Sequence, residues 1–231
     1  MQLGTTTWPE VEAVAGAALL VVPIGSTEQH GPHLPLDTDT RIAVALAERL
    51  ALARPSVVVA PALPYGASGE HAAFPGTLLM DHQTLAGVLT ELVRSARATF
   101  AGVVLLSAHG GNQEALALVA ATAEHEGDAV VTWSPSVPGG DAHAGRTETS
   151  LLLALCPELV RMERAEAGRT EPLANLLPQL RAEGVRPISS NGVLGDPQGA
   201  SADEGHALLE ALTTRLLSAL DARWPSTGGA A

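Results

Sequence analysis

Short apolar runs alternate with longer amphipathic segments along this chain. Four runs of mainly aliphatic residues predict buried strands, at residues 19–24, 57–60, 102–107 and 129–133. Apolar side chains spaced three or four positions apart predict helices at residues 41–54, 82–100, 113–126, 149–155 and 202–223. Strands that alternate with helices indicate an α/β fold, a parallel sheet with helices on both faces.

The remaining segments carry weaker signals. Thr40 is a possible N-cap of the first long helix. Residues 158–199 are interrupted by proline and glycine, and whether 173–197 forms a lid or an interface segment stays open. A length of 231 residues without a long linker suits one domain, which we place at residues 1–224. We expect residues 225–231 to form a disordered tail.

Composition excludes several classes of function. The formal net charge is −12, and all 13 basic residues are arginines, so nucleic-acid binding is not expected. The absence of lysine excludes Schiff-base catalysis and a P-loop. A single cysteine, Cys156, excludes a disulfide framework and fits a cytoplasmic protein. No apolar run reaches the roughly 18 residues of a membrane span.

Polar segments follow each of the four predicted strands. They cover residues 25–40, 65–76, 107–112 and 133–148. Ligands of open parallel sheets bind beyond the carboxyl ends of the strands. We therefore expect these segments to converge at one edge of the sheet.

The first polar segment has the residues of a metal site. Glu28 and His30 alternate in extended backbone, so their side chains project from the same side. Asp37 and Asp39 repeat this spacing just before a helix. Either aspartate is alternatively a helix cap, but Glu28, His30 and Asp39 together in one constrained loop favour metal ligation.

Two later segments add candidate ligands. His109 follows a buried strand directly and precedes Gly110, Gly111 and Asn112, although this sequence also suits a simple turn. His143 and Glu148 follow the fourth strand; the alternatives are a solvated histidine and an acid that favours the helix dipole. Mixed imidazole and carboxylate ligands suit zinc, manganese or iron(II), and two such ions suit metal-assisted hydrolysis of a C–N bond.

These motifs together resemble the creatininase family. The resemblance rests on residues 25–33, on Asp39, and on residues 74–77, 109–112 and 148–150, and it spans about residues 3–224. It implies a three-layer αβα sandwich around a mostly parallel sheet, two divalent ions per chain and a homo-oligomer, a hexamer or similar. By the same resemblance Glu28 and His109 hold one ion, His30 holds the other, and Asp39 bridges them.

One position departs from the pattern of the creatinine-hydrolysing enzymes. Those enzymes have a metal-binding glutamate two residues after the histidine that corresponds to His109, and this chain has Gly111 there. The departure argues against creatinine as the substrate. Our hypothesis is that Glu148 supplies the missing carboxylate.

A narrower resemblance points to a peptide substrate. Residues 3–9, 65–71, 141–150 and 191–197 resemble the branch that releases a modified C-terminal Val-Tyr dipeptide from a ribosomally made precursor peptide during redox-cofactor biosynthesis. We expect His143 to act as the general acid. The oxyanion would be bound by Asn112 or by the backbone amides of Gly110 and Gly111.

Three further residues are candidates for substrate binding. His71 and Glu70 lie on a loop at the same sheet edge, where a surface role is the alternative. Arg146 suits a peptide carboxylate, and its alternative is a structural ion pair. Rival functions for the whole chain are hydrolysis of a small cyclic amide or formamide, and a non-catalytic metal-binding scaffold.

Overall fold

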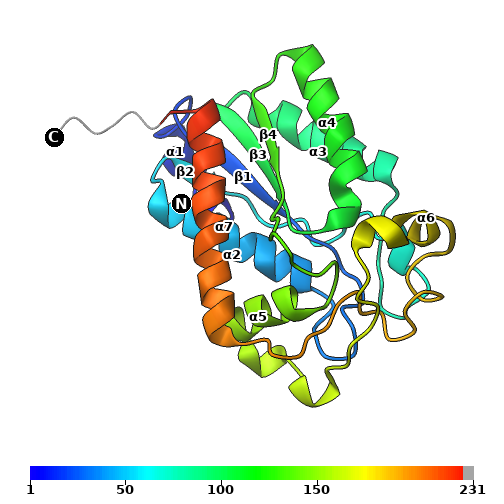
Figure 1. Cartoon of the computed structure of the whole chain (residues 1–231). Coiled ribbons are helices and arrows are strands. Elements are labelled where there is room, and N and C mark those ends of the chain that lie inside the picture. The colour runs from blue at the N-terminus through cyan, green and yellow to red at the C-terminus, as the bar shows by residue number, and fades with distance from the viewer. Residues whose placement is uncertain (226–231) are drawn as a thin grey trace.

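A four-stranded parallel sheet forms the centre of the molecule (Figure 1). The computed structural model describes residues 1–225. The strands are β1 (Leu19–Ile24), β2 (Val57–Val59), β3 (Gly102–Ser107) and β4 (Val130–Trp133), in the order β2-β1-β3-β4. β1 and β3 pair along their full lengths, from Leu19 with Gly102 to Ile24 with Ser107. The carboxyl ends of these two central strands therefore lie side by side.

Helices cover both faces of this sheet. α3 (His82–Ala96) and α4 (Gln113–Glu126) pack on one face, and α2 (Thr38–Ala53), α5 (Arg146–Leu155) and α7 (Ala202–Arg223) pack on the other. Alternate residues of each strand enter different cores: Leu20 and Val22 meet α3 and α4, whereas Leu19 and Val21 meet the other three helices. The predicted αβα sandwich is confirmed.

Most predicted elements are present, with differences at their ends. β1, β3, α4 and α7 have the predicted bounds. α2 begins at Thr38, so the prediction of Thr40 as N-cap is wrong: Asp37 holds that position. α3 ends at Ala96, four residues before the predicted end. α5 begins at Arg146, because the Asp141 carboxylate accepts hydrogen bonds from the backbone amides of residues 146 and 147 and thereby caps this helix.

The segment between α5 and α7 contains a helix that the sequence pattern did not predict. α6 (Leu173–Glu183) forms although it contains Pro178. Leu176 and Leu180 pack against Val185, Ile188 and Leu194 in a small separate core. Figure 1 shows α6 beside the carboxyl end of the sheet.

The other elements are short. α1 (Trp8–Glu12) precedes the sheet, and single 3-10 turns lie at Leu3–Thr5, Gly69–His71, Gly110–Asn112, Pro157–Leu159 and Met162–Arg164. Within residues 1–225 no helix is both long enough and apolar enough to cross a membrane. The predicted tail at 225–231 lies, apart from Pro225, outside the described residues.

Candidate metal centre

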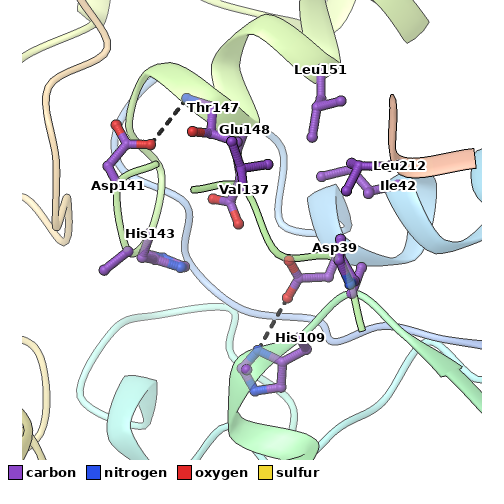
Figure 2. Close-up of a pocket in the computed structure, with 14 residues that line it drawn as sticks. Asp39, Ile42, His109, Val137, Asp141, His143, Thr147, Glu148, Leu151 and Leu212 are labelled. Carbon is purple, nitrogen blue, oxygen red and sulfur yellow. Dashed lines mark hydrogen bonds and ion pairs between the residues drawn. The ribbon is translucent and has the colours of Figure 1, made fainter. Parts of the chain in front are cut away.

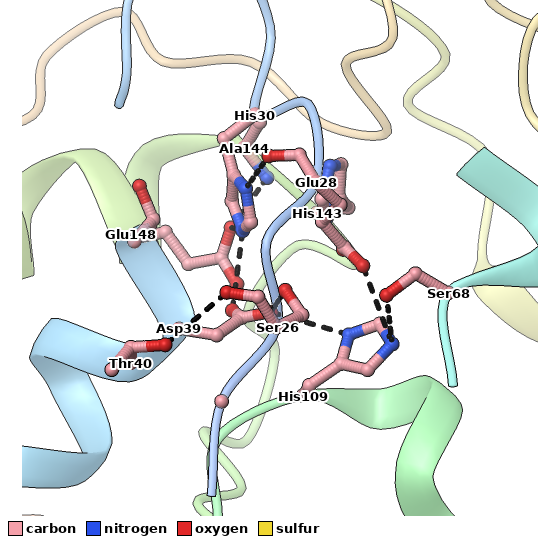
Figure 3. Close-up of polar contacts among 12 residues, drawn as sticks. Ser26, Glu28, His30, Asp39, Thr40, Ser68, His109, His143, Ala144 and Glu148 are labelled. Atoms are coloured by element: carbon pink, nitrogen blue, oxygen red, sulfur yellow. Dashed lines mark hydrogen bonds and ion pairs between the residues drawn. The ribbon is translucent and has the colours of Figure 1, made fainter. Parts of the chain in front are cut away.

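The polar segments that follow the four strands meet at one edge of the sheet, as the topology predicts (Figure 3). The loop after β1 brings Glu28 and His30, and the first turn of α2 brings Asp39. The loop after β3 brings His109, and the segment after β4 brings His143 and then Glu148 on α5. The site therefore consists of side chains that are far apart in the sequence.

Glu28, Asp39 and His109 form what we call the first cluster. The Glu28 Oε2 atom lies 3.3 Å from Nε2 of His109, and Nδ1 of the same ring lies 3.2 Å from Oδ2 of Asp39. All three side chains are buried, and their ligand atoms are close enough to share one ion. This is the set that the resemblance implies for the first ion, with Asp39 as the bridge.

His30, His143 and Glu148 form the second cluster. The His30 Nε2 atom lies 3.1 Å from Oδ1 of Asp39 and 3.9 Å from Oε2 of Glu148. Asp39 thus turns one oxygen toward each cluster, which is the geometry of a bridging carboxylate. Glu148 is the carboxylate of this cluster, the position that our hypothesis gives it.

A third group of possible ligands shares residues with both clusters. The Glu28 Oε1 atom lies 3.3 Å from Nε2 of His71 and 3.8 Å from Nδ1 of His143. His71 is only 4% exposed. The surface role that we considered for this residue is therefore wrong.

The Glu28 carboxylate makes this site suitable for a divalent cation. Both of its oxygens are buried and have no hydrogen-bond partner among the described residues. A buried carboxylate without donors is costly, and a cation relieves that cost. The surrounding imidazoles and carboxylates are the ligand types that zinc, manganese and iron(II) accept.

Without ions, protons balance the charges of the two clusters. Burial raises the pKa of both Glu28 and Glu148 to about 7. Burial alone would lower the pKa of His30 and His109, but the neighbouring carboxylates outweigh it and raise both to about 10. Burial would likewise raise the pKa of Asp39, but the two imidazoliums hold it well below its ordinary value. Metal binding must displace the protons on these two histidines.

The other two histidines of the site are neutral. Burial lowers the pKa of His71 to about 3, and burial also holds the pKa of His143 well below its ordinary value. The ring centroids of His143 and His30 lie 4.4 Å apart, and the ring centroids of His143 and His71 lie 4.5 Å apart. Each neutral ring carries one hydrogen and one lone pair, so the hydrogen bonds of the ring decide which nitrogen carries the hydrogen.

A cavity of about 180 Å³ opens beside the clusters (Figure 2). One part of its wall is polar and the other is aliphatic; the polar part includes Asp39, His109, His143 and Glu148, and the aliphatic part includes Ile42, Val137, Leu151 and Leu212. A group with an apolar portion next to a scissile bond would fit this space.

Three polar residues that our sequence reasoning missed hold the ligands in place. The Ser26 hydroxyl donates to Oδ2 of Asp39 at 2.7 Å, and the Ser68 hydroxyl lies 3.4 Å from Nε2 of His109. Gln29 contacts both neutral histidines. The sequence held one signal for Gln29. It lies between Glu28 and His30, and alternation in extended backbone directs its side chain to the side opposite theirs.

Asn112 has a structural role in this arrangement. Its Nδ2 atom donates to the Gly25 carbonyl at 3.1 Å and lies 3.0 Å from the Ser107 hydroxyl, and its Oδ1 accepts from the Ala67 amide at 2.8 Å. Both amide hydrogens are used and the side chain is fully buried. These contacts argue against the predicted oxyanion role for the Asn112 side chain, because no donor remains for a substrate.

Gly110 lies at the cavity, and Gly111 lies next to the His109 ring. Gly110 lines the cavity. A Cβ at Gly111 would overlap the Ala67 carbonyl and the His109 ring, and it would lie 2.7 Å from Oε1 of Glu70. Glycine at this position therefore lets the Glu70 carboxylate approach to 3.9 Å from His109 Nε2.

Arg146 lies outside the cavity lining. Its Nε donates to the Glu204 carboxylate at 2.8 Å on the neighbouring helix, and its side chain is 53% exposed. The ion pair that we weighed as the alternative is thus present. Binding of a peptide carboxylate by Arg146 stays a prediction.

The similarity of this chain to known proteins extends over nearly its whole length. The family model described as creatinine amidohydrolase matches residues 4–220. The chain belongs to the creatininase family. The creatininase fold, hydrolase activity and action on C–N bonds that the sequence predicted are thereby confirmed at the level of the family.

Individual members of the creatininase family are also similar to this chain over most of its length. The "Mycofactocin precursor peptide peptidase" of Mycolicibacterium smegmatis is 48% identical over 213 residues, which cover 89% of this chain and 85% of that protein. Two solved structures, titled "Creatininase Mn" and a "Zn-Zn type" creatininase, are each 28% identical with a TM-score of 0.79, and the match covers 97% of this chain and 98% of theirs.

Proposed function

We propose that this chain is a metal-dependent peptidase that cleaves the mycofactocin precursor peptide and releases its modified C-terminal Val-Tyr dipeptide. The observation that carries the proposal is the pair of clusters joined by Asp39 beside a partly aliphatic cavity. The similarity to a peptidase of that name supports the choice of substrate. The absence of a side chain at Gly111 separates the site from the pattern of the creatinine-hydrolysing enzymes.

The proposed ligands come from the two clusters, with Asp39 shared and His143 left out. Glu28, Asp39 and His109 would hold one ion, and His30, Asp39 and Glu148 would hold the other. When bound, such ions lower the pKa of water and polarise a carbonyl oxygen. We propose zinc, manganese or iron as the metal, in line with the manganese and zinc of the solved creatininases.

His143 is the proposed proton carrier. It is neutral, and its Nδ1 atom lies 3.8 Å from the Glu28 carboxylate at the wall of the cavity. A neutral Nδ1 with a lone pair accepts the proton that the attacking water loses and then donates it to the departing amine. The general acid predicted from the sequence thus acts first as a base.

Other residues of the site would bind the peptide. The backbone amide of Gly110, or that of Gly111, would donate to the substrate carbonyl oxygen. Glu70, which is 30% exposed, would contact the peptide next to the first cluster. We further propose that the chain works as a cytoplasmic homo-oligomer, in agreement with the free and buried Cys156.

Mass spectrometry of the cleaved peptide tests this function. The precursor peptide with its modified Val-Tyr end is incubated with metal-loaded protein, and Glu28→Ala and His109→Ala variants serve as controls. We expect the dipeptide only with the parent protein. If two ions bind and no dipeptide appears, the peptidase proposal is wrong and small amides and formamides become the substrates to test.

A further inference from the structure

Gln29 connects the two neutral histidines of the site. It lies between Glu28 and His30 and is only 5% exposed. Its Nε2 atom lies 2.8 Å from Nδ1 of His71 and 3.1 Å from Nε2 of His143, and its backbone carbonyl lies 2.8 Å from the latter nitrogen. One residue therefore touches both rings through two different groups.

The backbone carbonyl of Gln29 determines the tautomer of His143. A carbonyl oxygen only accepts hydrogen bonds, so Nε2 of His143 must carry the ring hydrogen. The Nδ1 atom of this neutral ring then has the lone pair. That atom faces Glu28 and the second cluster.

The side-chain amide of Gln29 determines the tautomer of His71. Its Oε1 accepts from the Gly31 amide at 2.8 Å, and its Nε2 donates to the Gly192 carbonyl at 3.0 Å, so two contacts fix the orientation of the amide. The second Nε2 hydrogen goes to His71, whose Nδ1 must accept it. The His71 Nε2 atom therefore carries the ring hydrogen, and this atom lies 3.3 Å from Oε1 of Glu28.

The backbone around Gln29 is shaped for these contacts. Gly192 has a φ of +81°, and a Cβ on it would overlap the Gln29 amide. Only glycine allows this close approach, which brings the Gly192 carbonyl to the amide nitrogen. The Gln29 amide is thus held by three partners besides the His143 ring.

We propose that Gln29 is a positioning residue that sets the Nε2-protonated tautomer on both His71 and His143. The lone pair of His143 Nδ1 stays open to a proton or an ion, whereas the hydrogen on His71 Nε2 closes that nitrogen to metals. Of the three groups of possible ligands, the set Glu28, His71 and His143 is therefore not a metal site. The protonated Nε2 of His71 instead lies 3.3 Å from one oxygen of Glu28. The consequence for the ions rests on the proposed metal-dependent function, but the tautomers do not.

Nitrogen-15 NMR of histidine-labelled protein tests the tautomers without any variant. In metal-free protein near neutral pH we expect His71 to be protonated at Nε2 only and His143 also at Nε2 only. A hydrogen on Nδ1 of His71, or of His143, would overturn the proposal.

A substitution at Gln29 tests the cause of these tautomers. The carboxylate introduced by Gln29→Glu accepts instead of donating, so we expect His71 to move its hydrogen to Nδ1. After loading with cadmium-113, nitrogen coupling to the metal should then appear at His71 Nε2, where the parent shows none. Gln83→Glu, the same change at an exposed position, should leave both rings unchanged.

Two results of the substitution would contradict the proposal. One is a folded Gln29→Glu protein whose His71 tautomer is unchanged, and the other is cadmium coupling to His71 in the parent protein. Peptide cleavage is measured in parallel. If the tautomers are as expected and no peptide is cleaved, the proposed substrate is wrong and the role of Gln29 stands.

Discussion

The Glu28 carboxylate is completely buried, and neither of its oxygens has a hydrogen-bond partner within residues 1–225. Its neighbours are three imidazole nitrogens at 3.3–3.8 Å, from His71, His109 and His143. In a protein without ions this arrangement destabilises the native state, because a charged form is poorly solvated there. Glu28 therefore favours ion binding at the expense of stability.

The opposite effects of Glu28 on ion binding and on stability lead to the first prediction. Glu28→Gln keeps the shape of the side chain and removes the charge, so we expect metal-dependent turnover to fall by at least about 100-fold. The free energy of unfolding of the metal-free protein should be unchanged or higher. Chemical denaturation and steady-state kinetics measure the two effects. A variant that is clearly less stable without metal would contradict this account of Glu28.

Glu148 allows a second prediction at the same scale. Glu148→Gln should lower the metal content from two ions per chain to one, because the second cluster loses a charged ligand. Elemental analysis of dialysed protein gives the ratio, and the exposed Glu158→Gln serves as the control. Two retained ions would remove Glu148 from its proposed role.

At the scale of elements, hydrophobic periodicity predicted the sheet and the long helices well. β3, for example, has six buried residues in a row, as expected of a strand covered on both faces. α6 escaped prediction because Pro178 interrupts its pattern and because its apolar residues pack only against a small local core. α2 begins earlier than predicted, at Thr38, and its N-cap residue Asp37 makes no side-chain cap hydrogen bond, so no cap signal marked this start.

The site could be located from the sequence, but its internal contacts could not. Strand ends placed Glu28, His109 and Glu148 at one edge of the sheet. Which nitrogen of His71 meets which oxygen depends on the path of two loops, and no sequence spacing records that path. The roles of Gln29 and Asn112 became evident only from their hydrogen bonds.

The contact between α5 and α7 carries a prediction for the elements. Gly205 of α7 is buried, and a Cβ there would overlap the Ser150 carbonyl of α5. Gly205→Ala should lower stability by about 1–3 kcal/mol through overpacking. It should also weaken metal binding, because α5 carries Glu148.

A glycine in another helix provides the control for this substitution. Gly87 of α3 is exposed, and a Cβ there would meet no atom within 4 Å. Gly87→Ala should raise stability by about 0.5–1 kcal/mol, because alanine loses less conformational entropy in a helix. Thermal unfolding of both variants, with and without metal, measures the change in stability and in metal binding at each position. Equal effects at the two positions would show that the α5–α7 contact is not tight.

For the whole molecule, the protons held by the metal-free site link stability to pH. His30 and His109 have native pKa values of about 10, against ordinary values of 6.5. Between pH 7 and 10 the native state therefore binds protons that the unfolded chain has already released. Stability must fall as pH rises through this window, since the native state binds more protons.

The corresponding prediction compares two forms of the protein. The melting temperature of the metal-free form should fall from pH 7 to pH 10, whereas the metal-loaded form should depend less on pH because ions replace these protons. Differential scanning calorimetry at matched ionic strength measures both. Parallel profiles for the two forms would show that His30 and His109 are not displaced from their protons by metal.

The parallel order of the sheet also affects how the chain folds. Strands consecutive in the sequence are joined by crossovers through α2, α3 and α4, and the ligands extend from Glu28 to Glu148. Such a topology has a high contact order. The entropy cost of closing its long loops comes before the stabilising contacts between strands form, so folding is slow. An ion at the first cluster would therefore be captured once β3 has joined β1, and an ion at the second cluster only after β4 and α5 have joined the sheet. The delay between the two binding events would then report when the β4–α5 segment docks.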